Sequence, residues 1–115
     1  MSVTIYHNPR CSKSRQTLEL IREQGIEPVI VEYLKDVPTV QTIENLLDLM
    51  ELKPRELMRR KEPEYKENNL DNENLSWAEL IRAMVKHPKL IERPIVVANG
   101  KAAIGRPPEN ILEIL

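Results

Sequence analysis

The chain begins with short apolar runs that alternate with a helical pattern. Residues 3–6 are β-branched and aromatic and end just before Asn8-Pro9, which predicts a buried strand. A helical pattern then runs from Cys11 to Gly25, where the glycine favours a helix end. Residues 28–33 predict a second strand. A β-α-β unit of this length favours two parallel strands with a right-handed connection.

The middle of the chain has helical spacing. Thr39 is a suitable cap for a helix whose apolar residues recur every three or four positions, at Ile43, Leu46, Leu47 and Met50. Pro54 fits the first position of a short helix that runs to about Arg60. We therefore expect two helices between residues 39 and 60.

A polar stretch separates these helices from a third. Residues 61–74 show no clear period and predict a surface loop or a frayed helix. Ser76 and Glu79 have capping-box spacing, and the apolar positions behind them predict a helix that runs to His87.

The last third predicts a hairpin and a terminal helix. Residues 93–105 contain two apolar runs joined by Asn99-Gly100, a strong hairpin signal, and a helix is expected from residues 106–108 to the last residue. The order is β-α-β, a helical insertion at about 39–91, and β-β-α. This order predicts an α/β thioredoxin-like fold with a mixed sheet, in a single domain spanning residues 1–115.

Composition limits the cellular compartments and the classes of partner that can be expected. The 115 residues carry a formal net charge of -1, so nothing attracts the whole chain to nucleic acid or to an anionic membrane, and any anion site must be local. A single cysteine excludes an intrachain disulfide and favours the reducing cytoplasm. The first residues show no signal-peptide pattern, and no apolar run approaches the ~20 residues of a spanning helix.

Cys11 is the first candidate for chemistry. It lies between a predicted strand and a predicted helix, where free N–H groups and the helix dipole favour the reactive thiolate. Arg10, Lys13 and Arg15 supply nearby cations. The alternative interpretation is a small buried apolar cysteine, which the polar surroundings make less attractive.

The spacing around the cysteine excludes two common thiol sites. Cys11 and Ser14 form C-x-x-S, so the second thiol of a dithiol redox motif is missing and an external thiol must resolve any adduct. The phosphatase-type spacing C-x5-R ends on Thr17, which argues against a phosphatase-like enzyme.

Four motifs resemble the glutaredoxin-coupled arsenate reductase family. They are His-Asn-Pro-Arg-Cys-Ser-Lys-Ser-Arg at 7–15, Glu-Leu-Met-Arg at 56–59, Arg-Pro-Ile-Val-Val at 93–97 and Gly-Arg-Pro at 105–107. The motifs occur in the family's order and the likeness covers essentially the whole chain, being nearest to the subgroup with this cysteine loop. The family's fold is thioredoxin-like, in agreement with the predicted element order.

The resemblance implies roles for individual residues. Cys11 matches the nucleophile, and His7 and Ser14 match positions that tune its thiol. Three arginines that gather around the oxyanion correspond to Arg59, Arg93 and Arg106. Guanidinium groups bind tetrahedral oxyanions bidentately and remain charged. Without the resemblance, each of these arginines would also fit an ordinary solvated surface position.

A proline adds a geometric expectation. Thioredoxin-like folds commonly have a cis-proline just before the third strand, facing the active cysteine. Arg93-Pro94 occupies that position, so the resemblance predicts a cis peptide there.

The resemblance also implies a reaction cycle. Cys11 would attack arsenate, glutathione would act as co-substrate and resolve the adduct with release of arsenite, and glutaredoxin would free the cysteine. No bound cofactor is expected, and His7, His87 and Cys11 do not make a metal site.

Two other classes of function stay open. One is a monothiol glutaredoxin-like oxidoreductase, for which the arginines would be unexplained. The other is a non-catalytic regulator of the same fold that binds RNA polymerase, although such regulators usually carry a second cysteine where this chain has Ser14. The residues Arg10, Ser12 and Lys13 replace the small residues that flank the cysteine in other arsenate reductases, and this difference bears on the substrate.

Overall fold

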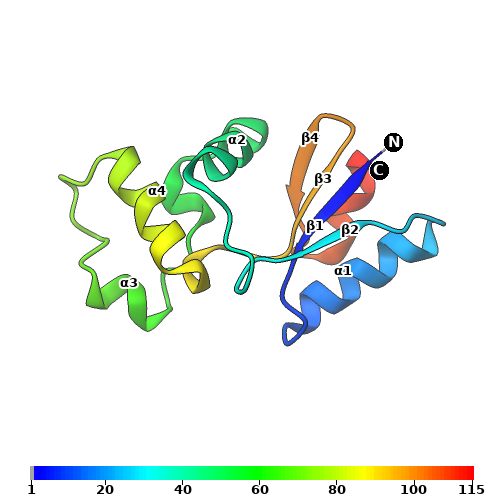
Figure 1. Ribbon diagram of the computed structural model, residues 1–115, viewed down its shortest axis with the longest axis horizontal. Helices are drawn as coiled ribbons and strands as arrows, with labels where there is room; N and C mark the ends of the chain where they lie inside the picture. The colour runs from blue at the N-terminus through cyan, green and yellow to red at the C-terminus, as the bar shows by residue number, and fades with distance from the viewer. Residues whose placement is uncertain (1) are drawn as a thin grey trace. The chain divides into compact units, whose positions relative to one another are not determined.

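The computed structural model describes residues 2–115, which form two compact units. The first unit joins the chain up to Asp36 to Arg93–Leu115, and the second is Val37–Glu92. In Figure 1 the first unit carries the blue, cyan, orange and red elements, and the second carries the green and yellow ones. The assignment of residues 1–115 to a single domain stays a prediction. Among residues 2–115, no helix is both long and apolar enough to cross a membrane.

A four-stranded mixed sheet forms the centre of the first unit. Its strands are β1 (Val3–His7), β2 (Val29–Glu32), β3 (Ile95–Ala98) and β4 (Lys101–Ile104), in the order β2-β1-β3-β4. β1 is parallel to β2 and antiparallel to β3, and β4 is antiparallel to β3. The predicted β-α-β unit and the mixed sheet are confirmed.

The hairpin between β3 and β4 turns at Asn99-Gly100. Both residues have positive φ, 54° for Asn99 and 72° for Gly100. A two-residue turn of the I′ type requires this conformation at both positions, and asparagine and glycine adopt it with little strain. The predicted hairpin is confirmed.

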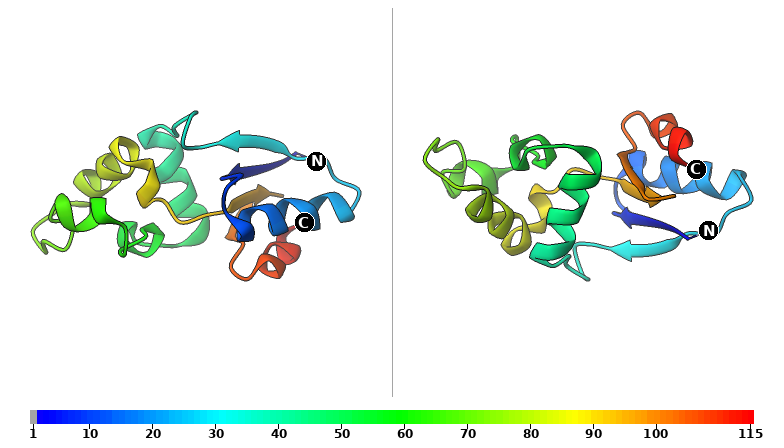
Figure 2. Two further views of the ribbon diagram at one scale, coloured as in Figure 1. Left: turned by 90° about the horizontal axis from the view of Figure 1, so that it is seen from below. Right: turned by 90° about the horizontal axis from the view of Figure 1, so that it is seen from above.

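One face of the sheet carries the core of the first unit. Side chains alternate along β1, so Val3 and Ile5 point to the same face. This face is covered by α1 (Ser12–Glu23) and by the 3-10 helix η3 (Pro108–Ile114), which lie side by side (Figure 2). The buried cluster joins residues from both ends of the chain: Val3, Ile5, Leu18, Ile21, Val96, Ala98, Ile111 and Ile114. Burial of each valine, leucine and isoleucine side chain in this cluster stabilises the fold by about 1.5–3 kcal/mol.

The ends of α1 follow the sequence. Cys11 is the N-cap residue, and Gly25 takes a left-handed φ of 75° just after the helix. The N–H groups of Gly25 and Ile26 donate to carbonyls of the last turn, as in helices that end on glycine. The helix predicted from the Cys11 loop to Gly25 is confirmed.

The second unit is helical and packs α2 (Val40–Met50) against α4 (Trp77–Lys86). The Thr39 hydroxyl accepts a hydrogen bond from the Thr42 N–H group, and Ser76 and Glu79 form the reciprocal capping box. The buried apolar residues of the two helices are Ile43, Leu46, Leu47, Leu80, Ile81 and Met84. Both predicted helices and their caps are confirmed.

The helix predicted from Pro54 to about Arg60 is shorter than expected. The 3-10 helix η1 spans Pro54–Leu57, and Met58 is already extended because it forms a β-bridge with Ile91. Pairing with a segment more than thirty positions away therefore ends the helix. The interpretation of Arg59 as a helical residue was wrong.

The polar stretch 61–74 is also more ordered than its composition indicates. It contains the short helix α3 (Pro63–Glu67), and the stretch is followed by α4 and by η2 (Pro88–Leu90). Tyr65 is buried and its hydroxyl donates to Asp71. The C-terminal helix also differs from expectation, because η3 is a 3-10 helix.

The capping box of α4 leads to a stability prediction. Replacing Ser76 by alanine removes the oxygen that accepts the Glu79 N–H group, at a cost of about 1 kcal/mol in the free energy of unfolding. Urea titration followed by circular dichroism measures the change. Glu79→Gln keeps an oxygen for the Ser76 N–H group, so it should cost less; equal losses would contradict this account.

Candidate active site

Cys11 sits in the turn between β1 and α1. Its N–H group donates to the Asn8 carbonyl at 3.0 Å, and its carbonyl accepts the Arg15 N–H group at 3.0 Å. Its backbone is extended, as an N-cap residue requires, and its side chain is 9% exposed. The turn thus holds a mostly buried thiol at the N-terminus of a helix of three turns.

The surroundings favour the thiolate. Burial by itself raises the pKa of the Cys11 thiol, since a charge is less stable away from water. Four other groups outweigh burial and lower the pKa below its ordinary value: the Ser14 N–H group, the Arg93 charge, the Lys13 N–H group and the Arg106 charge. The free N–H groups of the first helical turn and two distant arginines therefore act together on one sulfur.

The sheet topology explains how these arginines reach Cys11. Cys11 follows β1, Arg93 precedes β3 and Arg106 follows β4. Because β3 is antiparallel to its two neighbours, the end of β1, the start of β3 and the end of β4 meet at one edge of the sheet.

Arg106 makes the direct contact with the sulfur. Its Nη2 lies 3.7 Å from Cys11 Sγ, while its Nε donates to the Arg93 carbonyl at 2.8 Å. The predicted cis peptide at Arg93-Pro94 is confirmed, and a second cis peptide at Arg106-Pro107 was not predicted.

Gly105 permits this assembly. Its N–H group donates to the Pro94 carbonyl at 2.9 Å. A Cβ atom at Gly105 would lie 2.5 Å from Thr17 Oγ1 and 2.9 Å from Pro94 Cγ, closer than atoms can pack. Because Gly105 has no side chain, α1 can lie close to the two segments that contain Arg93 and Arg106. The sequence motif included Gly105, but its packing role was missed.

The role of Thr17 was also missed, because in the sequence it was considered only as the residue that stands where C-x5-R requires an arginine. It is fully buried and its hydroxyl donates to the Lys13 carbonyl at 2.8 Å. It supplies the α1 surface against which Gly105 packs. The sequence could have indicated this role, because Thr17 is a polar residue at a helix position that faces the core.

His7 and Ser14 form a buried pair beneath the cysteine loop. His7 Nδ1 lies 2.6 Å from Ser14 Oγ, which also accepts the Asn8 N–H group at 3.0 Å. Burial is the main cause that lowers the His7 pKa, opposed by Glu32 and assisted by Arg22 and Arg15. A lowered pKa favours the neutral imidazole. The pair therefore holds Ser14, whose N–H group faces the sulfur, by hydrogen bonding rather than by charge.

Arg59 lies in the second unit. Its guanidinium group forms ion pairs with Glu62 and Glu92, the latter with Nε and Oε1 4.0 Å apart. The backbone N–H group of Arg59 donates to the Leu90 carbonyl. Its predicted place beside the oxyanion stays a prediction. Two carboxylates already neighbour it, so an oxyanion that bound there would share the guanidinium group with them or replace them.

The cations of the cysteine loop contribute differently from the distant arginines. Arg10, Lys13 and Arg15 are exposed, and Arg15 Nη1 donates to the Pro9 carbonyl. None of the three side-chain charges is among the main groups that lower the Cys11 pKa. Among residues 2–115, no group of three or more His, Cys, Asp and Glu side chains is placed to hold a metal ion.

Comparison with known proteins places this site in a family. The model of the ArsC family matches residues 6–114. A protein of Haemophilus influenzae named "Arsenate reductase" is 51% identical, with all of both chains covered. The protein "Uncharacterized protein YfgD" of Escherichia coli strain K12 is 59% identical over 98% of this chain and 96% of its own.

The fold agrees with these matches. The solved structure titled "Arsenate reductase from Vibrio cholerae" is 55% identical, covers 100% of this chain and 98% of its own, and superposes with a TM-score of 0.98. The thioredoxin-like fold prediction is confirmed. Membership in the subgroup with the same cysteine loop stays a prediction.

The electrostatics of Cys11 lead to a second prediction. Arg106→Ala and Arg93→Ala should each raise the Cys11 pKa toward the ~8.5 of a free thiol, because each removes a cation that favours the thiolate. The difference in absorbance at 240 nm between each protein and its Cys11→Ser version during a pH titration reports this one thiolate, because the three tyrosines contribute equally to both. Arg10→Ala is the matched control: it removes the adjacent charge and should move the pKa less. A larger effect of Arg10→Ala would contradict the assignment.

The close packing at Gly105 gives a third prediction. Gly105→Ala should destabilise the fold by about 1–3 kcal/mol through overpacking and should raise the Cys11 pKa, because the arginines must move. Chemical denaturation and the same pH titration measure the two effects. Adding Thr17→Ala removes both clashing atoms of that side chain and should restore part of each loss. A double variant no better than Gly105→Ala would show that the clash is not the cause.

Proposed function

This chain belongs to the ArsC family, and on that basis we propose that it reduces arsenate to arsenite with Cys11 as the nucleophile. The observation that carries the proposal is the contact between Arg106 and the Cys11 sulfur in a setting that lowers the thiol pKa. A sulfur anion with a guanidinium group beside it is suited to attack a tetrahedral oxyanion, because the cation can bind the oxyanion and steady the charge during attack.

In the first step the Cys11 thiolate attacks arsenic and forms a sulfur–arsenic bond. One arsenate oxygen takes up protons and leaves as water, so arsenic stays pentavalent. Arg106 and Arg93 would neutralise the remaining oxyanion charge, and their guanidinium forks match two oxygens at once.

In the second step a thiol from outside the chain resolves the adduct. Glutathione, acting as thiolate, attacks the Cys11 sulfur, and a sulfur–sulfur bond forms as the electron pair of the sulfur–arsenic bond moves to arsenic. Arsenic becomes trivalent and leaves as arsenite, while the two thiols are oxidised to a mixed disulfide. Glutaredoxin then frees Cys11. The single cysteine supports an external resolving thiol, since the chain has no second thiol of its own.

The remaining predicted residues act through these groups. His7 and Ser14 are proposed to position the N–H group that faces the sulfur, as their hydrogen bond suggests. The family resemblance assigns Arg59 to the oxyanion as a third guanidinium group. No bound cofactor enters this cycle.

A coupled assay tests the function. With arsenate, glutathione, glutaredoxin and glutathione reductase, the protein should consume NADPH in an arsenate-dependent way. Cys11→Ser should abolish this turnover, because a hydroxyl does not replace a thiolate. Arg106→Lys keeps the charge but loses the fork, so kcat/KM should fall by about 10²-fold. Arg82→Lys, an exposed position on α4, is the control and should leave the rate unchanged.

Other results would favour the rival functions. Absence of turnover together with stable binding to RNA polymerase would support the regulator. A brown preparation that carries an iron–sulfur cluster, again without arsenate turnover, would support the monothiol glutaredoxin-like role. Turnover that survives Cys11→Ser would remove the proposed nucleophile.

A further inference from the structure

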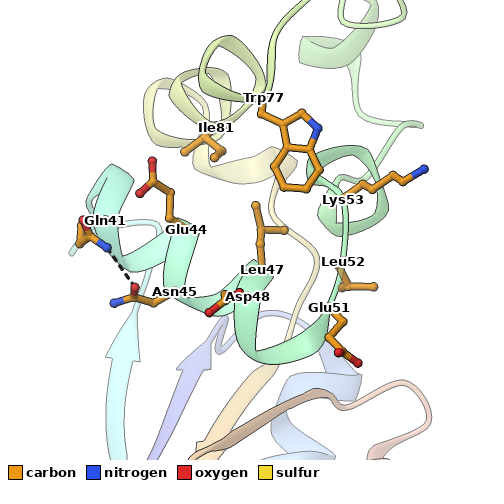
Figure 3. A pocket seen from close by; sticks show the side chains of 10 residues that line it. All are labelled: Gln41, Glu44, Asn45, Leu47, Asp48, Glu51, Leu52, Lys53, Trp77 and Ile81. Atoms are coloured by element: carbon orange, nitrogen blue, oxygen red, sulfur yellow. Dashed lines mark hydrogen bonds between the residues drawn. The ribbon is translucent and has the colours of Figure 1, made fainter.

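The second unit contains a groove that holds none of the predicted site residues. The groove lies between α2 and α4, has a volume of 570 Å³ and is shown in Figure 3. Leu47 points from α2 toward Trp77, and Ile81 of α4 completes the floor, with Leu52 at one end. Leu47 and Ile81 are buried, so Trp77 and Leu52 supply most of the open apolar surface. Its volume falls in the range of ordinary ligand sites.

The rim of the groove is acidic. Glu44, Asp48 and Glu51 are spaced by four and three positions, so they line one side of α2 and its C-terminal cap. Lys53 is the single cation among the lining residues, against these three carboxylates. Gln41 and Asn45 are hydrogen-bonded to each other and add neutral polar groups.

Trp77 is the most unusual residue of the groove. It is the only tryptophan of the chain and is 57% exposed, whereas Tyr33 and Tyr65 are buried. Its position at the start of α4 does not require an aromatic residue, because the capping box uses Ser76 and Glu79. Exposed tryptophans are frequent anchors in protein interfaces, and the indole face also attracts Lys and Arg side chains.

The recessed surface continues beyond the groove. Trp77 and Lys53 also line a second cavity of 410 Å³. It is bounded by Pro54, Leu75 and Leu80 and by charged side chains of both signs: Arg55, Arg60, Glu56 and Glu73. A small cation would fill only one of these cavities. A segment of a partner protein can instead cross Trp77, with its basic side chains at the acidic groove and neutral ones at the second cavity, where Lys53, Arg55 and Arg60 outnumber the carboxylates. This favours an extended occupant over a small molecule.

We propose that this groove, defined by Glu44, Asp48, Glu51, Leu47, Trp77 and Ile81, binds a basic amphipathic segment of a partner protein. Apolar side chains of the segment would pack chiefly on the exposed indole ring and on the half-buried Leu52. Its Lys or Arg side chains would face the three carboxylates, in the manner of a helix laid into a groove. This binding is independent of the chemistry at Cys11.

The native tryptophan makes the test direct. The probe is a designed peptide of about 14 residues, roughly four helical turns, with leucine on one face and lysine on the other. A peptide of the same pattern with glutamate in place of lysine is its counterpart. Binding of the lysine peptide should be saturable, should shift the Trp77 emission to shorter wavelength and should weaken with added salt. The glutamate peptide should not bind.

Charge variants separate a specific groove from diffuse attraction. Glu44→Gln with Asp48→Asn should weaken binding of the lysine peptide by about tenfold or more. Glu19→Gln with Glu23→Gln removes an equally spaced, exposed pair from α1 and should have little effect. Trp77→Ala, measured by anisotropy of a labelled peptide, should also weaken binding, with circular dichroism confirming that the exposed position tolerates the change.

Several results would overturn the proposal. They are absence of binding, equal losses in the two carboxylate pairs, binding of the glutamate peptide, or binding of the tetra-amine spermine as tight as that of the lysine peptide. The last result would assign the groove to small cations. None of these outcomes depends on arsenate turnover, so the proposed reductase activity is tested independently of peptide binding.

Discussion

A mostly buried sulfur anion must have its charge balanced, and much of the first unit serves that requirement. Burial opposes ionisation of Cys11, yet the N–H groups of Ser14 and Lys13 and the charges of Arg93 and Arg106 shift the balance toward the thiolate. Away from bulk water such interactions are stronger than on an open surface. The same partial burial that disfavours the thiolate therefore makes each compensating group more effective, including the Arg106 guanidinium group 3.7 Å from the sulfur.

The compensating groups come together through strand direction and one missing side chain. The antiparallel placing of β3 brings the residue before it to the same edge as the cysteine loop, and β4 returns the chain to that edge. Gly105 then lets α1 approach closely enough for the Arg106 guanidinium group to reach the sulfur. Residues ninety-five positions apart thus meet because of topology and close packing.

The near-neutral composition hides two opposite local arrangements. In the first unit, two guanidinium groups act on Cys11, and in the second unit three carboxylates line the same groove as an exposed Trp77. A formal net charge of -1 describes neither of them. Arg59 in the second unit has two carboxylates, Glu62 and Glu92, as neighbours. Local charge, rather than total charge, is thus what each unit presents to a partner.

The sequence by itself determined the elements that depend on local chemistry. The caps at Thr39 and Ser76, the Asn99-Gly100 turn, the α1 end at Gly25 and the lone thiol could all be predicted, because each signal lies within a few residues. It also indicated Arg93 and Arg106, but only through resemblance, since nothing near them in the chain points to a sulfur.

The tertiary structure decided the rest. Pairing of Met58 with Ile91 ended a helix, packing buried Tyr65 in a polar stretch, and the sheet placed Arg106 beside Cys11. Each of these outcomes depends on contacts between segments that are far apart in the sequence. The spacing of residues within one segment does not indicate which other segment it will contact.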